Sequence, residues 1–144
     1  MNLKSAEDPL VSMVVVTWNS APHIHGCLKQ LAEQVLRDFE ILIVDNGSQD
    51  FSAEEIISGY PSLEITINKL DRNLGFAAAN NIGARLARGK WLALLNADAY
   101  PEPDWLENLL KAAEANPGYT AFSSRQIQFH APEKLDGAGD CYHI

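Results

Sequence analysis

The stretch "WLALLNADAY", residues 91–100, begins with five apolar residues and becomes polar at Asn96 and Asp98. A short apolar run that is bounded by polar residues is typical of a buried β-strand. The same arrangement occurs twice earlier in the chain, in "VSMVVVT" (Val11–Thr17) and "FEILIVD" (Phe39–Asp45). The sequence therefore predicts three buried strands, each followed by polar residues.

Segments with helical periodicity separate these strands. Apolar residues recur at helical spacing in the segments that begin at Pro22, Gly75 and Pro103. Weaker patterns predict a short helix that Ser52 opens, a strand at 63–68 and strand-like pieces within 119–130. Apolar strands that alternate with helices are typical of an α/β fold with a mostly parallel central sheet and helices on both faces. We expect one Rossmann-like domain over the 144 residues.

The ends of the strands indicate where a ligand would bind. In open parallel sheets, ligands bind outside the carboxyl ends of the strands. This rule places on one edge the residues that end or follow the three buried strands: Thr17, Trp18, Asn19, Asp45, Asn46, Gly47, Asn96 and Asp98.

Composition limits the kind of ligand. The chain has 47% hydrophobic residues, as an ordinary globular protein has, and a formal net charge of −8. Binding of a nucleic acid polymer depends on clustered lysine and arginine, so this charge argues against such a partner. A small phosphorylated ligand remains compatible, because a divalent cation, backbone N–H groups and one or two arginines can hold it.

No apolar run is long enough to span a bilayer, and the first ten residues lack the apolar segment of a signal peptide. We therefore expect a cytoplasmic protein. A peripheral position at the inner membrane face, or an anchor outside this sequence, remains compatible with it.

Two cysteines, Cys27 and Cys141, are too few for a disulfide framework. His23, His25 and Cys27 have a spacing reminiscent of metal sites, but His25 would point away from the other two on a helix. Structural histidines and a half-buried thiol are therefore expected, and no zinc site.

Two common nucleotide sites are excluded by the residues. Asp45 could act as the ribose-binding acid of a dinucleotide site, but that site needs glycines in the turn after the first strand. The turn here, residues 18–22, contains no glycine, and the chain contains no P-loop motif.

What remains is a site with an aromatic side chain and several charged side chains. Trp18 can stack on a base, Asp45 can accept from a base or a ribose hydroxyl, Arg72 before "NLG" can meet a phosphate, and Asp98 can bind Mg²⁺ or Mn²⁺.

Four motifs in this order, "VSMVVVTWNS", "FEILIVDNGSQD", "NLGFAAANNIG" and "LALLNADAYPEPDWL", resemble the N-terminal half of a family 2 glycosyltransferase with the GT-A fold. Within the family they are most similar to the rhamnosyltransferase-like branch. The resemblance implies an inverting hexosyl transfer from a UDP- or dTDP-sugar to a hydroxyl of a saccharide or lipid-linked acceptor, as in polysaccharide biosynthesis. It also implies that this chain is the donor-binding part of a longer enzyme.

The resemblance also implies roles for individual residues. Donor contacts are expected from Thr17, Trp18, Asn19, Asp45, Asp50, Arg72, Asn80, Asn96 and Asp98. Asn96 and Asp98 match the D-x-D motif, whose second acid binds the metal. Since Asn96 replaces the first acid, Asp98 is expected to be the one protein carboxylate at the Mn²⁺ or Mg²⁺ ion. No acid in the chain can be assigned as the catalytic base, so we expect 1–144 to bind donor without transferring the sugar.

Each of these interpretations has an alternative. Trp18 could be a core aromatic, Asp45 a turn residue, Asp50 the cap of the helix at Ser52, and Arg72 a solvated loop charge. The small residues Ala77, Ala78, Ala79 and Gly83 are interpreted as close helix–sheet packing. For the whole chain, the alternatives are a complete, non-catalytic nucleotide-sugar-binding module and a nucleotidyltransferase. The latter normally carries a glycine- and arginine-rich loop after the first strand, which this chain lacks.

Overall fold

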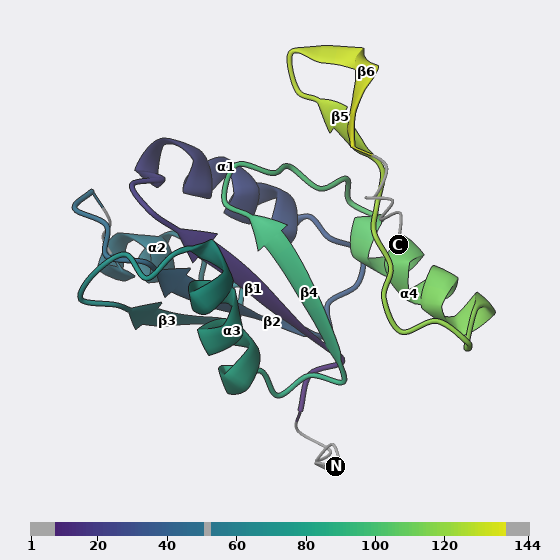
Figure 1. Cartoon of the computed structure of the whole chain (residues 1–144), viewed down its shortest axis with the longest axis horizontal. Helices are drawn as coiled ribbons and strands as arrows, with labels where there is room; N and C mark the ends of the chain where they lie inside the picture. Colours follow the sequence, from purple (N-terminus) through teal and green to yellow (C-terminus); the bar gives the residue numbers. More distant parts are fainter. Residues whose placement is uncertain (1–7, 51–52, 138–144) are drawn as a thin grey trace, which may run out of the picture. The chain divides into compact units, whose positions relative to one another are not determined.

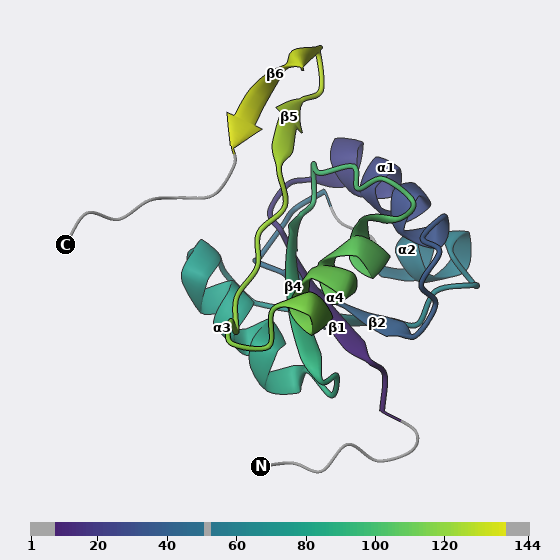
Figure 2. The ribbon, with the colours of Figure 1, turned by 90° about the vertical axis from the view of Figure 1, so that its right-hand side faces the viewer.

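The computed structural model describes residues 8–50 and 53–137, which fall into two compact units divided after Pro103 (Figure 1). The first unit contains a four-stranded sheet with the strand order β3-β2-β1-β4, in which every pair is parallel. Its elements are β1 (Val11–Thr17), α1 (Ala21–Ala32), β2 (Phe39–Asp45), α2 (Ala53–Gly59), β3 (Ile65–Lys69), α3 (Phe76–Leu86) and β4 (Trp91–Asn96). Figure 2 shows α1 and α2 on one side of the sheet and α3 on the other. The predicted α/β fold with a parallel sheet is confirmed.

Several boundaries differ from those predicted. The third strand begins at Ile65, two residues later than expected. Helix α3 ends at Leu86, before the predicted end at Gly89, because Ala87 adopts an extended conformation with φ −63° and ψ 132°. Helix α1 ends at Ala32, and this leaves exposed Val35, the last residue of the apolar pattern that predicted the helix. The expected cap at Ser52 lies outside the described residues.

Helix α3 packs closely on the sheet. Val14, Leu42 and Val44 of β1 and β2 form a buried cluster with Ala79 of α3. A Cβ atom added at Gly83 would lie 2.5 Å from Val14 Cγ1, so this position accepts no larger residue without a shift. The predicted packing role of the small residues is therefore confirmed at these two helix positions, whereas Ala77 and Ala78 are exposed.

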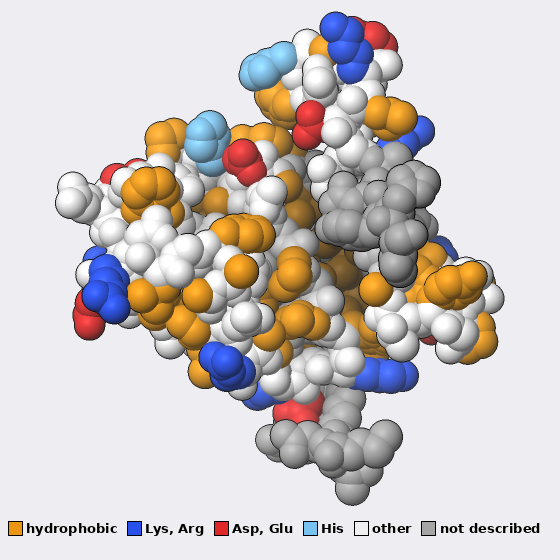
Figure 3. All heavy atoms as spheres, viewed as in Figure 1, with side chains coloured by type: hydrophobic (Ala, Val, Ile, Leu, Met, Phe, Trp, Pro, Cys, Tyr) orange, Lys and Arg blue, Asp and Glu red, His pale blue; other side chains and the backbone are white. Residues whose placement is uncertain are grey.

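The face of β4 that lies on the α3 side of the sheet is more exposed than predicted. Leu92 and Leu94 are 46% and 55% exposed. They pair with Ser12 and Val14 of β1, whereas α3 packs mainly on β1 and β2. Figure 3 shows hydrophobic side chains at the surface along β4. The apolar pattern predicted the strand correctly but not its place at the edge of the sheet.

A buried polar network joins the amino ends of β1 and β2 to the segment after α3. Glu40 is 2% exposed and accepts hydrogen bonds from Ser12 Oγ at 2.5 Å and from Arg88 N at 3.0 Å. Its second oxygen accepts from Arg88 Nε and Nη2 at 2.9 and 2.6 Å, and the same guanidinium contacts Glu64. Burial raises the pKa of Glu40, but the hydrogen bonds from Ser12 and Arg88 and the charge of Arg88 together bring this pKa below its ordinary value.

The second unit contains α4 (Trp105–Ala115) and an antiparallel hairpin of β5 (Gln126–Gln128) and β6 (Ala131–Gly137). The helix begins two residues after Pro103, where it was predicted to open, and Lys111 Nζ lies 3.0 Å from Glu107 Oε2 one turn away. Within the described ranges, none of the helices has the length and apolar character needed to cross a membrane.

We expect Glu40→Gln to lower the free energy of unfolding by about 2 kcal/mol, because hydrogen bonds to a charged group are worth roughly 1.5–3 kcal/mol. The pKa of Glu40 is lowered in the folded state, so its contribution to stability is present above the unfolded pKa of about 4.3. It is lost as pH falls through the lower, folded-state pKa. Urea unfolding of the two proteins between pH 3 and pH 7 measures this difference.

Glu64→Gln is the matched control, because Glu64 contacts the same guanidinium with a side chain that is 61% exposed. An exposed ion pair is worth about 1 kcal/mol or less. Equal losses in the two variants at neutral pH would contradict the dominant role of the buried pair. A difference between wild type and Glu40→Gln that stays constant below pH 4 would contradict the lowered pKa.

Candidate functional site

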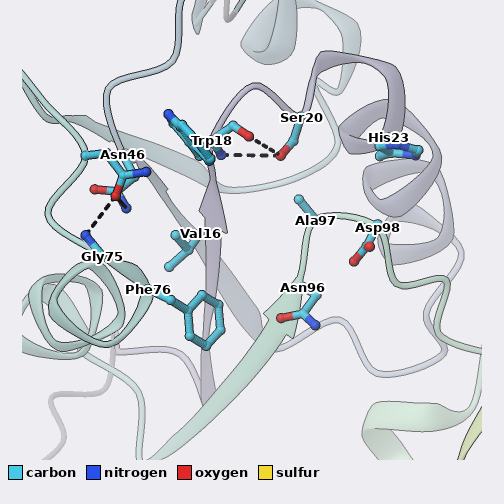
Figure 4. A pocket seen from close by; sticks show the side chains of 11 residues that line it. Val16, Trp18, Ser20, His23, Asn46, Gly75, Phe76, Asn96, Ala97 and Asp98 are labelled. Atoms are coloured by element: carbon cyan, nitrogen blue, oxygen red, sulfur yellow. Dashed lines mark hydrogen bonds between the residues drawn. The ribbon is translucent and has the colours of Figure 1, made fainter. Parts of the chain in front are cut away.

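A pocket of about 470 Å³ lies at the carboxyl end of the sheet, at the edge that the sequence predicts (Figure 4). Its walls come from the ends of β1 and β4, the first turn of α1 and the loops that follow β2 and precede α3. The lining residues are Val16, Trp18, Ser20, His23, Asn46, Asn73, Gly75, Phe76, Asn96, Ala97 and Asp98. The volume falls within the range of small-molecule sites.

Hydrogen bonds join the turn after β1 to the turn after β2. Asn19 adopts a left-handed conformation with φ 49°, which asparagine tolerates better than most residues. Its side-chain oxygen accepts from Gln49 N at 3.0 Å, and its backbone N–H donates to Ser48 Oγ at 2.9 Å. Asp50 Oδ2 accepts from Ala21 N at 3.2 Å, at the start of α1. This bond ties Asp50 to the start of α1, whereas the alternative that Asp50 caps a helix opened by Ser52 involves residues outside the described ranges.

The joined turns present Trp18 at the pocket wall. Trp18 is 56% exposed, so the alternative of a core aromatic is wrong. Ser20 Oγ donates to the Trp18 carbonyl at 3.2 Å and lies 3.3 Å from Trp18 N, as Figure 4 shows. A large apolar side chain that a fold leaves exposed at a pocket is a candidate contact for a ligand.

An amide pair shapes the part of the wall that the loop before α3 forms. Asn46 Nδ2 donates to Asn73 Oδ1 at 2.9 Å, and Asn46 Oδ1 accepts from Leu74 N at 2.8 Å. Asn73 Oδ1 also accepts from Gly75 N at 2.8 Å. These bonds fix the loop before α3, from which Phe76 enters the pocket lining. Sequence reasoning did not assign this role, although Asn46 lies in the predicted turn after β2 and Asn73 lies just before a predicted helix.

Gly47 allows the same loop to approach the turn after β2. Its φ is +80°, a region that residues with a Cβ atom rarely adopt. A Cβ atom there would lie 2.7 Å from the carbonyl carbon of Arg72 and 2.9 Å from Asn73 N. The loop that carries Arg72 is thus placed by backbone packing, while the Arg72 side chain is exposed and outside the pocket lining.

The end of β4 supplies the acidic part of the pocket. Asn96 and Asp98 are exposed and line it, with the buried Ala97 between them. A turn in which Ala99 N donates to the Asn96 carbonyl at 3.0 Å follows the strand. Asn96 and Asp98 thus line the same pocket at the carboxyl end of the sheet.

His23 also lines the pocket, which corrects the prediction of a structural histidine. It lies exposed in the first turn of α1, because this end of the helix faces the carboxyl ends of the strands. Cys27, predicted to be half-buried, is fully buried one turn later. Burial, with a smaller effect of the Asp98 charge, raises the pKa of its thiol to about 12, so it stays protonated at neutral pH.

Thr17 and Asp45 end neighbouring strands but are fully buried and outside the pocket lining. Asp45 Oδ1 accepts from Ser48 N at 3.0 Å, as the alternative of a turn residue predicted. Thr17 Oγ1 and Asp45 Oδ2 have no hydrogen-bond partner within the described residues. Unpaired buried polar atoms are uncommon and need an explanation, such as a group that arrives with a ligand.

The remaining predicted residue, Asn80, is buried on α3 and donates from Nδ2 to the Phe76 carbonyl at 3.1 Å. Its neighbour Asn81 is exposed, so the expected division between an inward and an outward amide is present. The structure thus brings Trp18, Asn96 and Asp98 together around one pocket. It places outside the lining Thr17, Asn19, Asp45, Asp50, Arg72 and Asn80.

The oxygen atoms in the pocket could coordinate a divalent cation if a bound ligand supplied further coordinating atoms. The Asp98 carboxylate and the Asn96 amide oxygen are hard ligands of the kind that Mg²⁺ and Mn²⁺ accept. Over residues 8–50 and 53–137, no three histidine, cysteine, aspartate or glutamate side chains gather as a metal site. Further ligands, such as phosphate oxygens or water, would therefore have to complete the coordination.

A family model described as glycosyl transferase family 2 matches residues 12–134. Glycosyltransferase AglE of Haloferax volcanii is 38% identical over 104 residues, which cover 69% of this chain and 34% of that protein. The succinoglycan biosynthesis protein ExoO of Rhizobium meliloti is 33% identical over 107 residues, 74% of this chain and 30% of that protein. The chain spans about a third of the length of such curated relatives.

Solved structures share the fold. The mannosyltransferase PcManGT from Pyrobaculum calidifontis, in complex with GDP-Man and Mn²⁺, is 32% identical, with a TM-score of 0.68 over 75% of this chain and 33% of that one. Residues 1–349 of S. aureus TarS, in complex with UDP-GlcNAc, give a TM-score of 0.67 at 24% identity over 74% of this chain and 32% of that one. The likeness to TarS concerns the fold alone.

We expect Asn46→Ala to release the loop before α3, because it removes the acceptor of Leu74 N and the donor to Asn73. Loss of such a buried hydrogen bond costs about 1–3 kcal/mol. Amide hydrogen exchange at Leu74 should therefore accelerate about tenfold or more, since 1.4 kcal/mol corresponds to a factor of ten. Asn81→Ala, on the exposed side of α3, is the control and should leave this exchange unchanged. Unchanged exchange at Leu74 in folded Asn46→Ala would contradict the role of the amide pair.

Proposed function

The chain belongs to glycosyl transferase family 2, and we propose that its residues 11–98 bind a nucleotide-diphospho-sugar and a divalent cation for transfer of the sugar to an acceptor hydroxyl. The observation that carries this proposal is the pocket itself, where an exposed indole, Trp18, and an exposed carboxylate, Asp98, occupy different walls of one cavity (Figure 4). A base stacked on the indole would direct its diphosphate toward the carboxylate.

Relatives support the ligand class. PcManGT is described with GDP-Man and Mn²⁺, and TarS with UDP-GlcNAc, and both share the fold of this chain. A UDP or dTDP donor, a hexosyl unit, inversion at the anomeric carbon and a saccharide or lipid-linked acceptor are the finer parts of the proposal. They rest on the resemblance to family members, including the rhamnosyltransferase-like branch.

At the base, Asp45 Oδ2 and Thr17 Oγ1 are the candidate partners. Both atoms are buried without a hydrogen-bond partner in the described part of the chain. An unsatisfied buried acceptor costs about 1–3 kcal/mol, and a base N–H or a ribose hydroxyl that reached Asp45 would relieve this cost. Asn19 and Asp50 would act on the same end of the ligand by holding the turns that carry Trp18.

At the diphosphate, Arg72 and Asn80 belong to the segment that ends in the first turns of α3. The exposed Arg72 guanidinium could pair with phosphate oxygens, for which its planar donors are well suited. Asn80 would position the start of the helix through its bond to the Phe76 carbonyl.

The chemistry at Asp98 follows from its charge. A bound divalent cation stabilises the negative charge that develops on a leaving diphosphate. Asp98 would orient that ion with a single carboxylate, while the Asn96 amide would bond a ribose hydroxyl without adding charge. Because the protein supplies only this one negative charge from the motif, we propose that the cation and the nucleotide bind together. No residue of the chain is assigned as the base that deprotonates the acceptor.

We expect nucleotide-sugars to stabilise the protein in a metal-dependent way. Ligand at about a hundred times its Kd adds about 2.7 kcal/mol, which raises Tm by several degrees for a domain of this size. Thermal shifts with UDP-, dTDP- and GDP-sugars, each with Mn²⁺ and with EDTA, test this. The shift should disappear in Asp98→Asn, which removes the charge and keeps the shape, and persist in the control Asp71→Asn on an exposed loop. An equal shift in EDTA would rule out the metal role.

We expect Trp18→Ala to weaken nucleotide binding about tenfold or more, because stacking of a base on an aromatic is worth roughly 1–3 kcal/mol. Fluorescence titration and calorimetry with UDP measure the effect. Nucleotide should quench emission in wild type and in the control Trp91→Phe, whose indole lies outside the pocket lining, but not in Trp18→Phe. Unchanged affinity in folded Trp18→Ala would remove the indole from the binding site.

A further inference from the structure

His23 and Asp98 are the ionisable side chains among the pocket-lining residues that the structure describes. They come from different elements, His23 from the first turn of α1 and Asp98 from the turn after β4. Figure 4 shows both on the same side of the pocket, with the Asp98 carboxylate turned toward its interior. An imidazole and a carboxylate that share one wall form a mixed nitrogen and oxygen donor set.

The surroundings of the two histidines of α1 differ. His25 stacks against Tyr60 with ring centroids 6.0 Å apart, and its Nε2 lies 3.9 Å from Glu55 Oε1. The ring of His23 makes no such contact in residues 8–50 and 53–137, and its backbone N–H donates to the Ser20 carbonyl. The His25 imidazole is therefore held by its contacts with Tyr60 and Glu55, whereas the His23 imidazole is available to a ligand in the pocket.

Because Asn96 is an amide and carries no charge, a further ligand from His23 would matter for binding of the cation. One carboxylate leaves a divalent cation with a single protein charge, and oxygen donors alone do not discriminate strongly between Mg²⁺ and Mn²⁺. A neutral imidazole nitrogen adds a ligand that transition-metal ions accept more readily than Mg²⁺ does. The Cys27 thiol cannot take this place, because it is fully buried and outside the pocket lining.

We infer that the His23 imidazole is the second protein ligand of the cation that Asp98 binds, and that it makes the site prefer Mn²⁺ to Mg²⁺. This inference rests on the proposed function, since the nucleotide diphosphate would supply further ligands to the same ion. It adds a residue from the first turn of α1 to a site that would otherwise depend on the end of β4.

Pulsed electron paramagnetic resonance on the full chain with Mn²⁺ and UDP tests the inference directly. A coordinated imidazole should modulate the electron spin echo at ¹⁴N frequencies, and ¹⁵N-histidine labelling should change that modulation, which excludes nitrogen from the base or buffer. The signal should disappear in His23→Gln and persist in the matched control His25→Gln on the same helix. In competition titrations, His23→Gln should also reduce the preference for Mn²⁺ over Mg²⁺ about tenfold, whereas His25→Gln should not.

The outcomes separate this inference from the proposed function. Coupling to ³¹P of UDP without histidine nitrogen would overturn the His23 assignment and leave donor binding intact. Histidine coupling that persists in His23→Gln would also overturn it. If no nucleotide raises Tm, the proposed function fails, and Mn²⁺ alone then decides the inference: absence of a histidine signal overturns it, and a signal lost in His23→Gln supports it. Circular dichroism confirms that each variant is folded.

Discussion

Parallel pairing of β1 with β2 and β4 fixes which side chains meet at the carboxyl end of the sheet. The register places Val16 beside Asn96 and Thr17 beside Asp45. Because successive side chains of a strand point to opposite faces, these two pairs lie on opposite sides of the sheet. The first pair lies on the side of α3 and lines the pocket, whereas the second is buried. A shift of one residue would exchange these roles, so the pocket depends on the register of β1.

Buried polar groups are hydrogen-bonded to different extents at the two ends of the sheet. At the amino end, every oxygen of Glu40 has partners, and the network joins β1, β2 and the segment after α3. At the carboxyl end, Thr17 Oγ1 and Asp45 Oδ2 are left unpaired among the described residues. The unsatisfied buried polar atoms therefore lie at the end of the sheet where ligands bind in folds of this kind. Violations of the usual rules of polar satisfaction are expected at functional sites. The paired network and the pocket thus lie at opposite ends of the same strands.

Sequence patterns predicted what depends on short-range order. The apolar runs gave β1, β2 and β4 with their observed bounds, and the polar strand ends gave Trp18, Asn96 and Asp98. The exposure of Leu92 could not be predicted, because an edge strand and a central strand have the same local pattern. Nor could the pairing of Asn46 with Asn73, which lie 27 residues apart and meet only after β2 and α3 are in place.

The place of His23 at the pocket could not be predicted for a related reason. Its spacing with His25 and Cys27 describes a single helix, whereas Asp98, which lines the same pocket, follows β4. Local spacing describes one element, and the pocket is assembled from several. Such a residue becomes recognisable only when the topology has placed the start of α1 beside the end of β4.

The joined turns around the pocket have a consequence for the entropy of association. Asn19, Ser48 and Asp50 tie the turns after β1 and β2 to each other, and Gly47 lets the loop at Arg72 pack directly on them. Ordering a flexible loop on binding would cost conformational entropy that subtracts from affinity. Walls that are ordered beforehand avoid most of this loss. Differences in affinity among small molecules at this pocket should then reflect the contacts that each one makes, rather than how well each one organises the protein.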